Sequence, residues 1–366
     1  MKRLHSKSVL LILFLVSCLV NVFFVLKVLA HSPLTPGSNE SLDTASLIPE
    51  PSKSWAVYAE LHEGGEAQYY YFNLSQGARI FISLLKSTDP KEAEFLPSFV
   101  LIGPNVTSQG TVPSYVEVPS GYGSIVVNGA QPSQAMYEPF SPSSLYQVAE
   151  IDIDAPGLGT HYIAVFEPSQ GGHYSLAVGY IEKFTIDEWI FIPFNLINIY
   201  LWEGQSLLLI LAPLMATLII GLVFMVWQWK TKGELRTVPA WFAGLAGLLF
   251  LGTGFMTLLQ IVISVAKTSL VPEIIVTVIF ALIPILLGVA ALRVALKKRQ
   301  DILRTRIYLA MIGIAALFIW AGLIAGPILA IIGGLLPLRR QSAESRCNPT
   351  QVNDQSNRKS PYEFRS

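Results

Sequence analysis

Three carboxylates in one short stretch are the first residues whose types and spacing could do chemistry. Glu150, Asp152 and Asp154 alternate with apolar residues, and successive side chains of a β-strand point to opposite faces. The carboxylates therefore share one face of a predicted strand, where they could supply oxygen ligands to Ca²⁺. The alternative, which we favour, is a solvated outer face opposite a core-facing row of Ala and Ile.

Aromatic and histidine side chains offer two further candidates. Four consecutive aromatic residues could stack on sugars: Tyr69, Tyr70, Tyr71 and Phe72. Alternation along a strand sends two of the four inward, which favours core packing. His161 and His173 lie on neighbouring predicted strands and could meet, but two scattered histidines are more often ordinary strand residues than metal ligands.

The sequence carries no recognisable catalytic motif. A Ser-His-Asp order, a phosphate-binding loop, His-Glu-x-x-His and Cys-x-x-Cys are all missing. Cys18 and Cys347 lie outside 31–205, so no internal disulfide can form there. The histidines lie outside the apolar runs, which excludes a transmembrane haem with His ligands. We expect a non-enzymatic protein with no cofactor, Ca²⁺ being the one candidate, and no nucleic-acid partner.

Three glycosylation sequons begin at Asn39, Asn73 and Asn105. All three lie between residues 31 and 205, the part that we expect to be exported. Sequons fit a surface location, although such triplets also arise by chance.

Charge is distributed unevenly along the 366 residues, although 25 basic residues balance 25 acidic ones. Residues 31–205 contain 19 acidic and 5 basic side chains, a net of −14. The chain is 52% hydrophobic and only 14% charged, against roughly 25% charged residues in an ordinary soluble domain. This composition excludes a wholly soluble globular protein and indicates membrane spans.

The first 54 residues predict an export signal and a linker. Basic residues open 1–30, an apolar run follows, and Val28-Leu29-Ala30 has the small residues of a cleavage site. The run is long for a signal peptide, so an uncleaved signal-anchor is the alternative. Residues 31–54 are rich in Pro, Ser, Thr and Asn, which is typical of a linker.

Residues 55–180 predict an all-β domain, an antiparallel sandwich. Short alternating runs are separated by clusters of Gly, Pro, Ser and Asn, and no helix-length periodicity interrupts them. The expected strands are 55–61, 67–73, 79–86, 98–102, 115–118, 123–127, 146–153, 161–166 and 173–179.

Part of this region resembles a known family. The segments EAQYYYFNLSQGARIFISLLKS, FLPSFVLIGP and YQVAEIDIDAPGLGTHYIAVFEPSQGGHYSLAVGY are similar to the bacterial pre-peptidase C-terminal (PPC-like) domain, over about residues 60–180. The resemblance implies a small jelly-roll-like sandwich that serves as a binding or accessory module. Its motifs occupy turn and core positions, so they bear on fold and not on activity.

The segment 181–205 predicts an aromatic helix at the membrane interface. A capping box at Thr185–Glu188 begins it, aromatic residues follow, and Pro193 should kink or end it. The alternative is a buried connecting helix under the sandwich. A transmembrane bundle of about four helices follows in 206–338, with spans at 207–227, 239–266, 271–296 and 307–338.

Loop charges set the orientation of these spans. Basic residues cluster after the first and third spans, which places those loops in the cytoplasm and the β-domain outside, in a multi-pass plasma-membrane protein. The run 307–338 is long for one helix. We favour a single kinked or tilted span, and a tight hairpin near Gly322–Pro327 is the alternative. The tail, 339–366, is polar and predicted to be disordered.

These patterns lead to one functional hypothesis and two rivals. We expect a membrane protein that presents an acidic extracytoplasmic β-sandwich for binding or sensing, with the bilayer and an extracytoplasmic ligand or other membrane proteins as partners. The first rival is an accessory subunit of a larger membrane complex. The second is a membrane-anchored hydrolase that uses the acidic strand face.

Overall fold

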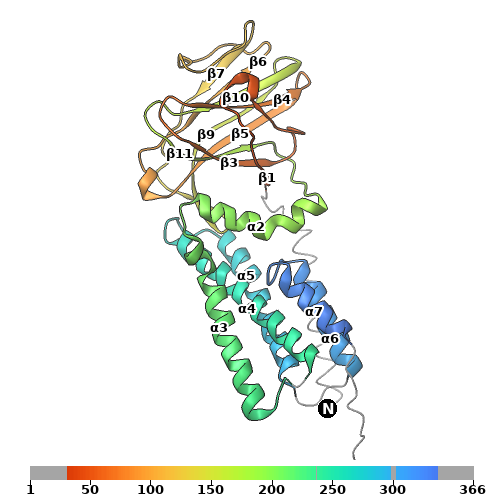
Figure 1. The fold of residues 1–366 in the computed structure, drawn as a ribbon. Helices are drawn as coiled ribbons and strands as arrows, with labels where there is room; N and C mark the ends of the chain where they lie inside the picture. Colours follow the sequence, from red (N-terminus) through yellow and green to blue (C-terminus); the bar gives the residue numbers. More distant parts are fainter. Residues whose placement is uncertain (1–30, 236, 298–301, 337–366) are drawn as a thin grey trace, which may run out of the picture.

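The computed structural model describes residues 31–235, 237–297 and 302–336. Within these ranges a two-sheet β-region is followed by six helices, and the two parts lie end to end (Figure 1). The predicted signal, 1–30, and the predicted tail, 339–366, lie outside the described residues.

Eleven strands form the two sheets of the β-region. They are β1 (Ser32–Leu34), β2 (Ser46–Leu47), β3 (Trp55–Leu61), β4 (Ala67–Leu74), β5 (Arg79–Ser87), β6 (Ser98–Gly103), β7 (Gly123–Val127), β8 (Met136–Glu138), β9 (Ser143–Asp154), β10 (Gly159–Phe166) and β11 (Gly172–Val178). All the predicted strands but one are confirmed. The prediction at 115–118 was wrong, because a turn bonded from Val116 N to Pro113 O occupies that segment.

The sheets have the strand orders β1-β3-β11-β5-β9-β8 and β2-β4-β10-β6-β7. The chain crosses between them repeatedly, since β3, β5, β9 and β11 lie in the first sheet and β4, β6 and β10 in the second. Large side chains that face inward from both sheets are fully buried, among them Val57, Phe72, Leu84, Phe99 and Ile163. The region is therefore a sandwich with a hydrophobic core between its two sheets.

The expected linker, 31–54, is part of the sandwich. β1 pairs in parallel with β3, and β2 pairs in parallel with β4, so each adds an edge strand to one sheet. Strands of two or three residues are too short to show a period of two, which is why the sequence pattern did not reveal them. A proline such as Pro33 is tolerated there because an edge strand needs fewer backbone donors.

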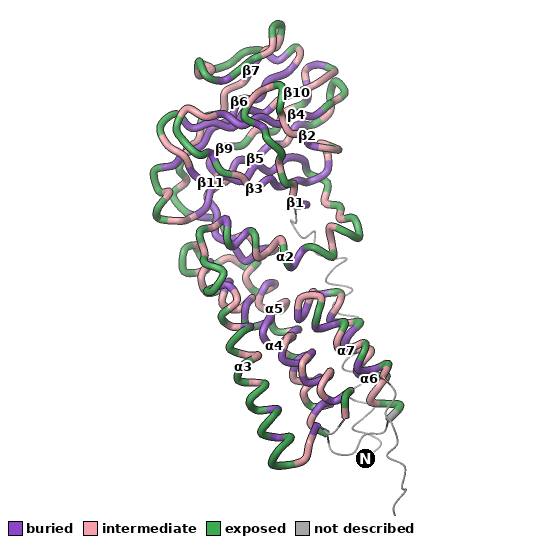
Figure 2. The backbone as a smooth tube through the Cα atoms, viewed as in Figure 1, coloured by how far each residue is buried: buried purple, intermediate pink, exposed green. Residues whose placement is uncertain are grey.

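The helices follow as α2 (Ile186–Trp202), α3 (Leu207–Lys232), α4 (Val238–Val265), α5 (Glu273–Ala295), α6 (Ile302–Leu317) and α7 (Ala325–Leu335). Among the described residues, α3, α4 and α5 are long and apolar enough to cross a membrane. These three correspond to the first three predicted spans. Many residues of these helices, above all of α3, are exposed (Figure 2), as expected for surfaces that face lipid.

The single fourth span was wrong, because 307–338 contains a turn. α6 and α7 pack against each other as a hairpin, and the segment between them includes Gly322 with φ +71°. The Gly322 N–H donates to Thr253 Oγ1 of α4 at 2.8 Å. Arg306, near the start of α6, donates to the carbonyls of Gly334 and Leu335 at the end of α7, at 2.8 and 2.7 Å. The two bonds from Arg306 hold the start of α6 beside the end of α7.

Glycines allow the closest helix contacts. A Cβ atom on Gly288 of α5 would lie 2.7 Å from the Gly247 carbonyl oxygen of α4, so the two backbones touch. Gly322 and Gly326 both face the ring of Phe250 on α4. The Gly-x-x-x-Gly spacing of Gly322 and Gly326 therefore serves packing inside this bundle.

Candidate functional site between the sandwich and the helices

The acidic strand face lies in solvent. Glu150, Asp152 and Asp154 are all exposed on β9. Arg79 binds both carboxylate oxygens of Asp152, at 2.8 and 2.7 Å, and Gln147 donates to Glu150. The arrangement matches the solvated outer face that we favoured. Among the described residues, no three His, Cys, Asp or Glu side chains form a group that could hold a metal ion.

The aromatic run packs mainly inside the protein. Tyr70 and Phe72 lie in the core between the sheets, and Tyr69 is buried on the outer face of the second sheet. Tyr71 is partly exposed and lies against Tyr162, with ring centroids 6.2 Å apart. Core packing is thus the main use of these residues.

The two strand histidines do not meet. His161 is on β10 in the second sheet, and His173 is on β11 in the first. His161 is buried and stacked on Phe72, and burial lowers its pKa. It is therefore a neutral core residue, the more ordinary of the two readings.

The sequons differ in accessibility. Asn73 and Asn105 are exposed. Asn39 is buried, and its amide nitrogen, the atom that would carry a glycan, is out of contact with solvent. The folded structure therefore disfavours Asn39 as a glycosylation site and leaves Asn73 and Asn105 as candidates.

Helix α2 lies across the outer face of the first sheet, between the sandwich and the other helices (Figure 1). Its N-terminal capping box joins Thr185 and Glu188. Glu188 also forms an ion pair with Lys53, whose Nζ lies 2.6 Å from Glu188 Oε1. Its buried side chains include Ile192 and Ile199. The segment predicted as interfacial is thus also the connecting helix under the sandwich.

Pro193 does not end α2. The carbonyl group that a residue other than proline would bond within the helix accepts a hydrogen bond from a distant residue instead. Proline has no N–H to donate to the carbonyl four residues earlier, which is that of Trp189. The indole of Trp320, in the α6–α7 turn, donates to this carbonyl at 2.8 Å. The ring of Trp320 also lies 5.0 Å from that of Trp189. The hairpin is thus fixed to α2 at the proline.

The loop between β8 and β9 binds the ends of α4 and α5. Ser264 of α4 donates to the Pro142 carbonyl, and Thr277 of α5 donates to the Pro139 carbonyl at 3.1 Å. Ala135 forms a β-bridge with Thr268, between the two helices. The sandwich therefore contacts the bundle directly, as well as through α2.

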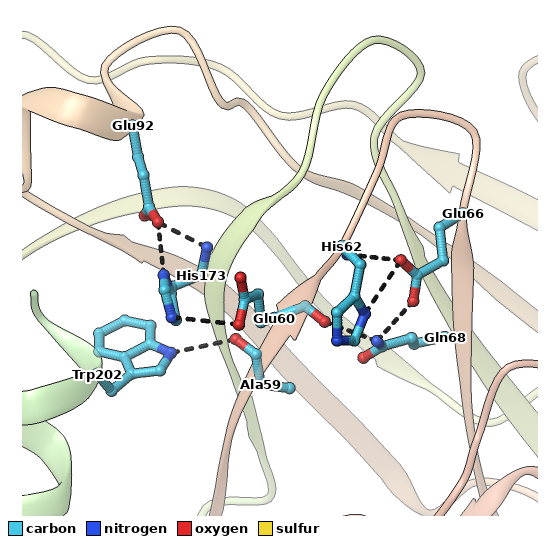
Figure 3. Close-up of polar contacts among 8 residues, drawn as sticks. All are labelled: Ala59, Glu60, His62, Glu66, Gln68, Glu92, His173 and Trp202. Carbon is cyan, nitrogen blue, oxygen red and sulfur yellow. Dashed lines mark hydrogen bonds and ion pairs between the residues drawn. The ribbon is translucent and has the colours of Figure 1, made fainter.

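A histidine cluster fixes the last turn of α2 (Figure 3). The Trp202 indole donates to the Ala59 carbonyl of β3 at 3.1 Å, and its ring lies edge-on to that of His173, at 6.3 Å. His173 Nδ1 lies 2.5 Å from Glu92, and its Nε2 lies 3.6 Å from Glu60. The hydrogen bond with Glu92 raises the pKa of His173. His173 is therefore paired with two carboxylates, those of Glu92 and Glu60, on the same sheet face that α2 covers.

A cavity of about 40 Å³ remains where α2 crosses the sheet. Its walls include His31 before β1, Tyr58 on β3, Glu138 at the end of β8, and Asn195 on α2. Roughly 10–15 Å³ of such volume suffices for one water molecule. The cavity therefore has room for a few waters or a small hydrated ion.

Two partly buried acidic side chains lie at this junction. Burial raises the pKa of Glu138 to about 7, with a smaller contribution from the negative charge of Glu182. Burial also raises the pKa of Glu203, just after α2, to about 7, and Lys267 partly offsets this effect. Within the described part of the chain, Glu203 Oε1 has no hydrogen-bond partner, although Gln205 donates to Oε2 at 3.2 Å. Buried carboxyl groups with raised pKa values are concentrated at functional sites.

Sequence reasoning did not select His31, Glu138 or Glu203. Glu138 lies in Glu-Pro-Phe-Ser-Pro, a stretch that reads as an ordinary loop, and His31 lies in the expected linker. One signal was available: His31 directly follows the predicted cleavage site. The others come together only through the fold.

No family model matches this chain, and no curated protein matches it.

Proposed function

We propose that the protein is a non-enzymatic, multi-span membrane protein that holds an acidic β-sandwich outside the cytoplasm to bind or sense a ligand. The sandwich would pass the binding event to the helices. The resemblance of about residues 60–180 to PPC-like binding and accessory modules supports a binding role.

The observation that carries the proposal is the way in which the sandwich is attached. Contacts at separate points join it to the helices: Trp202 to Ala59, Ser264 to Pro142, Thr277 to Pro139, and Lys53 to Glu188. A module that is only tethered needs a flexible linker and no such contacts. A docked sandwich can change the helix positions when it binds a ligand.

Charge supports the proposed orientation. α3 and α5 run away from the sandwich, and the basic residues near their far ends include Lys230, Lys232 and Arg293 (Figure 1). Arg306 lies near the start of α6, at the same far end. Basic residues favour the cytoplasmic side, so the sandwich would lie on the opposite side.

Chemical labelling of whole cells tests this orientation. In a chain with Cys18 and Cys347 replaced by Ser, a single Ser75→Cys substitution places a thiol in an exposed turn of the sandwich. A matched Lys232→Cys variant places it at the far end of α3. We expect an impermeant maleimide to label Ser75→Cys on intact cells and Lys232→Cys only after permeabilisation. The reverse pattern would contradict the proposal.

A second candidate, an accessory subunit of a larger membrane complex, is favoured by α3. Only 11% of the most apolar 18-residue stretch of α3 is buried within this chain, against 44% of the corresponding stretch of α4. Such a surface suits lipid or the helices of another subunit. Mass determination after purification in mild detergent separates the two: a single chain with bound detergent supports the stand-alone protein, and a stable hetero-complex supports the subunit.

A further inference from the structure

Helix α2 keeps an apolar surface exposed, although it lies between the sandwich and the other helices. Five of its large apolar side chains are exposed: Ile186, Ile190, Phe191, Phe194 and Leu201. Single exposed apolar residues are ordinary, but a contiguous group of them marks a surface that binds a partner or a membrane. We call these five residues the α2 stripe.

The five side chains share one face of the helix. Ile186, Ile190 and Phe194 follow one another at intervals of four residues, the spacing of neighbours on one side of a helix. Leu201 comes seven residues after Phe194, which is two helical turns. Phe191 borders the same face, since its ring centroid lies 6.4 Å from that of Phe194. The α2 stripe is therefore one continuous surface.

The α2 stripe faces away from the sandwich. The other side of the helix carries Ile192, Asn195 and Ile199, which line the cavity against the first sheet. At 3.6 residues per turn, these three positions lie roughly 140–180° around the helix axis from Ile190. Helix α2 also runs crosswise to α3, at the end of the bundle nearest the sandwich (Figure 1). The stripe therefore faces the level at which the spans begin.

Exposed apolar side chains of other helices continue the α2 stripe at both ends. After its C-terminal end, Leu207 and Leu208 at the start of α3 are exposed. Towards its N-terminal end, the exposed Phe318 follows α6, and its ring centroid lies 6.3 Å from that of Trp189 on α2. Since α3 is long and apolar enough to cross a membrane, its exposed surface suits lipid. Lipid that covers the start of α3 would also reach the stripe.

We propose that the α2 stripe inserts into the lipid leaflet next to the sandwich, and that this leaflet is a binding partner that positions α2. A helix with one apolar face lies in a membrane in this way, with that face at the boundary between headgroups and acyl chains. The inference rests on the membrane location in the proposed function, and it holds for either orientation of the sandwich.

Lipid contact would position a helix that both parts of the molecule bind. Trp202 at the end of α2 donates to the Ala59 carbonyl of the sandwich, and the Trp189 carbonyl accepts from Trp320 of the hairpin. The depth of α2 in the leaflet would therefore set the depth of both the sandwich and the hairpin.

Charge decides which lipid suits the α2 stripe. The segment 181–205 contains four acidic residues and one basic residue, Lys183. Among the acidic residues, Asp187 in the first turn of α2 is exposed. Helices that bind anionic lipid at the membrane surface carry many Lys and Arg side chains on the polar face. The stripe therefore suits zwitterionic headgroups such as phosphatidylcholine better than anionic ones.

Spin labels at single cysteines of the full chain test the proposal. Cys18 and Cys347 are replaced by Ser, and a nitroxide is attached at Phe194→Cys, where the native ring is 43% exposed. Leu47→Cys is the matched control, because Leu47 is 49% exposed on an edge strand of the sandwich. Ile220→Cys, at a position that is 71% exposed on α3, reports on the span itself. In nanodiscs of phosphatidylcholine, collisions with oxygen, which concentrates in lipid, are compared with collisions with a water-soluble nickel chelate.

We expect the ratio of oxygen to nickel collisions at Phe194→Cys to lie well above that at Leu47→Cys and close to that at Ile220→Cys. In discs of phosphatidylglycerol, the ratio at Phe194→Cys should fall towards that of Leu47→Cys, while the ratio at Ile220→Cys stays the same. An equal or higher ratio at Phe194→Cys in the anionic discs would overturn the choice of zwitterionic lipid.

The three positions separate this inference from the proposed function. A ratio at Phe194→Cys that equals that of Leu47→Cys, with Ile220→Cys in lipid, would overturn the inference and leave the membrane location standing. A low ratio at Ile220→Cys as well would overturn both. Few collisions with either reagent at Phe194→Cys would mean that protein covers the stripe, which also contradicts lipid binding.

Unfolding in phosphatidylcholine discs gives a second readout. Phe194→Asp should lower the unfolding midpoint, because the new charge would have to enter the apolar part of the leaflet. Leu47→Asp, on the sandwich surface, should leave the midpoint almost unchanged. Equal midpoints for the two variants would contradict insertion of the stripe.

Discussion

The sandwich and the helical bundle bury different kinds of side chain. The sandwich core is filled by large residues such as Phe72, Phe99 and Leu84. The bundle also buries large residues such as Phe250, but alanines make up much more of its core, with Ala243, Ala246 and Ala291 fully buried. Gly247 and Gly288 bring the backbones of α4 and α5 into contact.

The difference reflects the solvent that each part excludes. In water, burying apolar area stabilises a fold by roughly 25 cal/mol per Å², so large core residues contribute most. Between helices in lipid this driving force is missing, and close backbone approach and hydrogen bonds contribute instead. Four substitutions test the contrast, from the largest expected effect to the smallest.

Phe99→Ala should destabilise the sandwich by about 3–5 kcal/mol, because it removes a fully buried ring and leaves a cavity. The measurement is the midpoint of thermal unfolding in mild detergent. Phe255→Ala on α4 is the control, since that ring is 41% exposed on a span surface. An equal loss for both variants would contradict the contrast between the regions.

Glu203→Gln should remove a pH dependence that arises where the two regions meet. Burial raises the pKa of the folded carboxyl from 4.5 to about 7, so the folded state keeps a proton that the unfolded state has lost. Stability should therefore fall as pH rises from about 4.5 to 7 and then level off. The substitution should reduce this change, because Glu138 keeps its own contribution over the same pH range, and should raise stability at pH 8 by about 1–3 kcal/mol.

Unfolding midpoints measured from pH 4.5 to 8 check this prediction. Lys267, Tyr200, Gln205 and Ser143 are the groups that act on Glu203, and all stay unchanged in the variant. Glu150→Gln on the exposed face of β9 should keep the original profile. A Glu203→Gln profile that matches the unchanged protein would refute the assignment.

Gly288→Ala should destabilise the bundle by about 1–3 kcal/mol, because the new Cβ would lie 2.7 Å from the Gly247 carbonyl oxygen. Gly37→Ala is the control in the β-region, where the nearest atom lies 3.9 Å away. It should change the unfolding midpoint little. Similar midpoints for the two variants would mean that α4 and α5 do not pack backbone to backbone.

Trp320→Phe should cost about 0.5–1.5 kcal/mol, the usual net contribution of one hydrogen bond, because it removes the donor to the Trp189 carbonyl. A double-mutant cycle with Pro193→Ala isolates the cause. Alanine restores an N–H that the Trp189 carbonyl can accept, so Trp320→Phe should cost less in that background. Equal costs in both backgrounds would refute the compensation.

Regular patterns in the sequence predicted the strands and the first three spans well. Alternation in 55–61 and 79–86 required one buried face, and apolar runs as long as α3 and α5 have few alternatives to crossing a membrane. Short or uniform segments were predicted poorly. β1 is too short to show a period, and the run 307–338 has no polar residue to mark its turn.

The candidate site was the least predictable part. The acidic face of β9 drew attention because its spacing is regular, and it proved to be an exposed surface. His31 and Glu138 show no regular spacing, because only the fold brings both to the wall of one cavity. Pro193 was expected to kink or end the helix; α2 continues through it, and a tryptophan far along the chain supplies the hydrogen bond that the proline cannot make.

The sequence by itself determined the division into a β-region and a membrane region, most of the strands, and three of the helices. Local periodicity and the length of apolar runs suffice for these features. The tertiary structure decided between a single fourth span and the α6–α7 hairpin, and it alone decided the docking of the sandwich on α2 and the cavity that His31 and Glu138 line. Each depends on contacts between residues far apart in the chain, such as Thr253 with Gly322, which local patterns leave open.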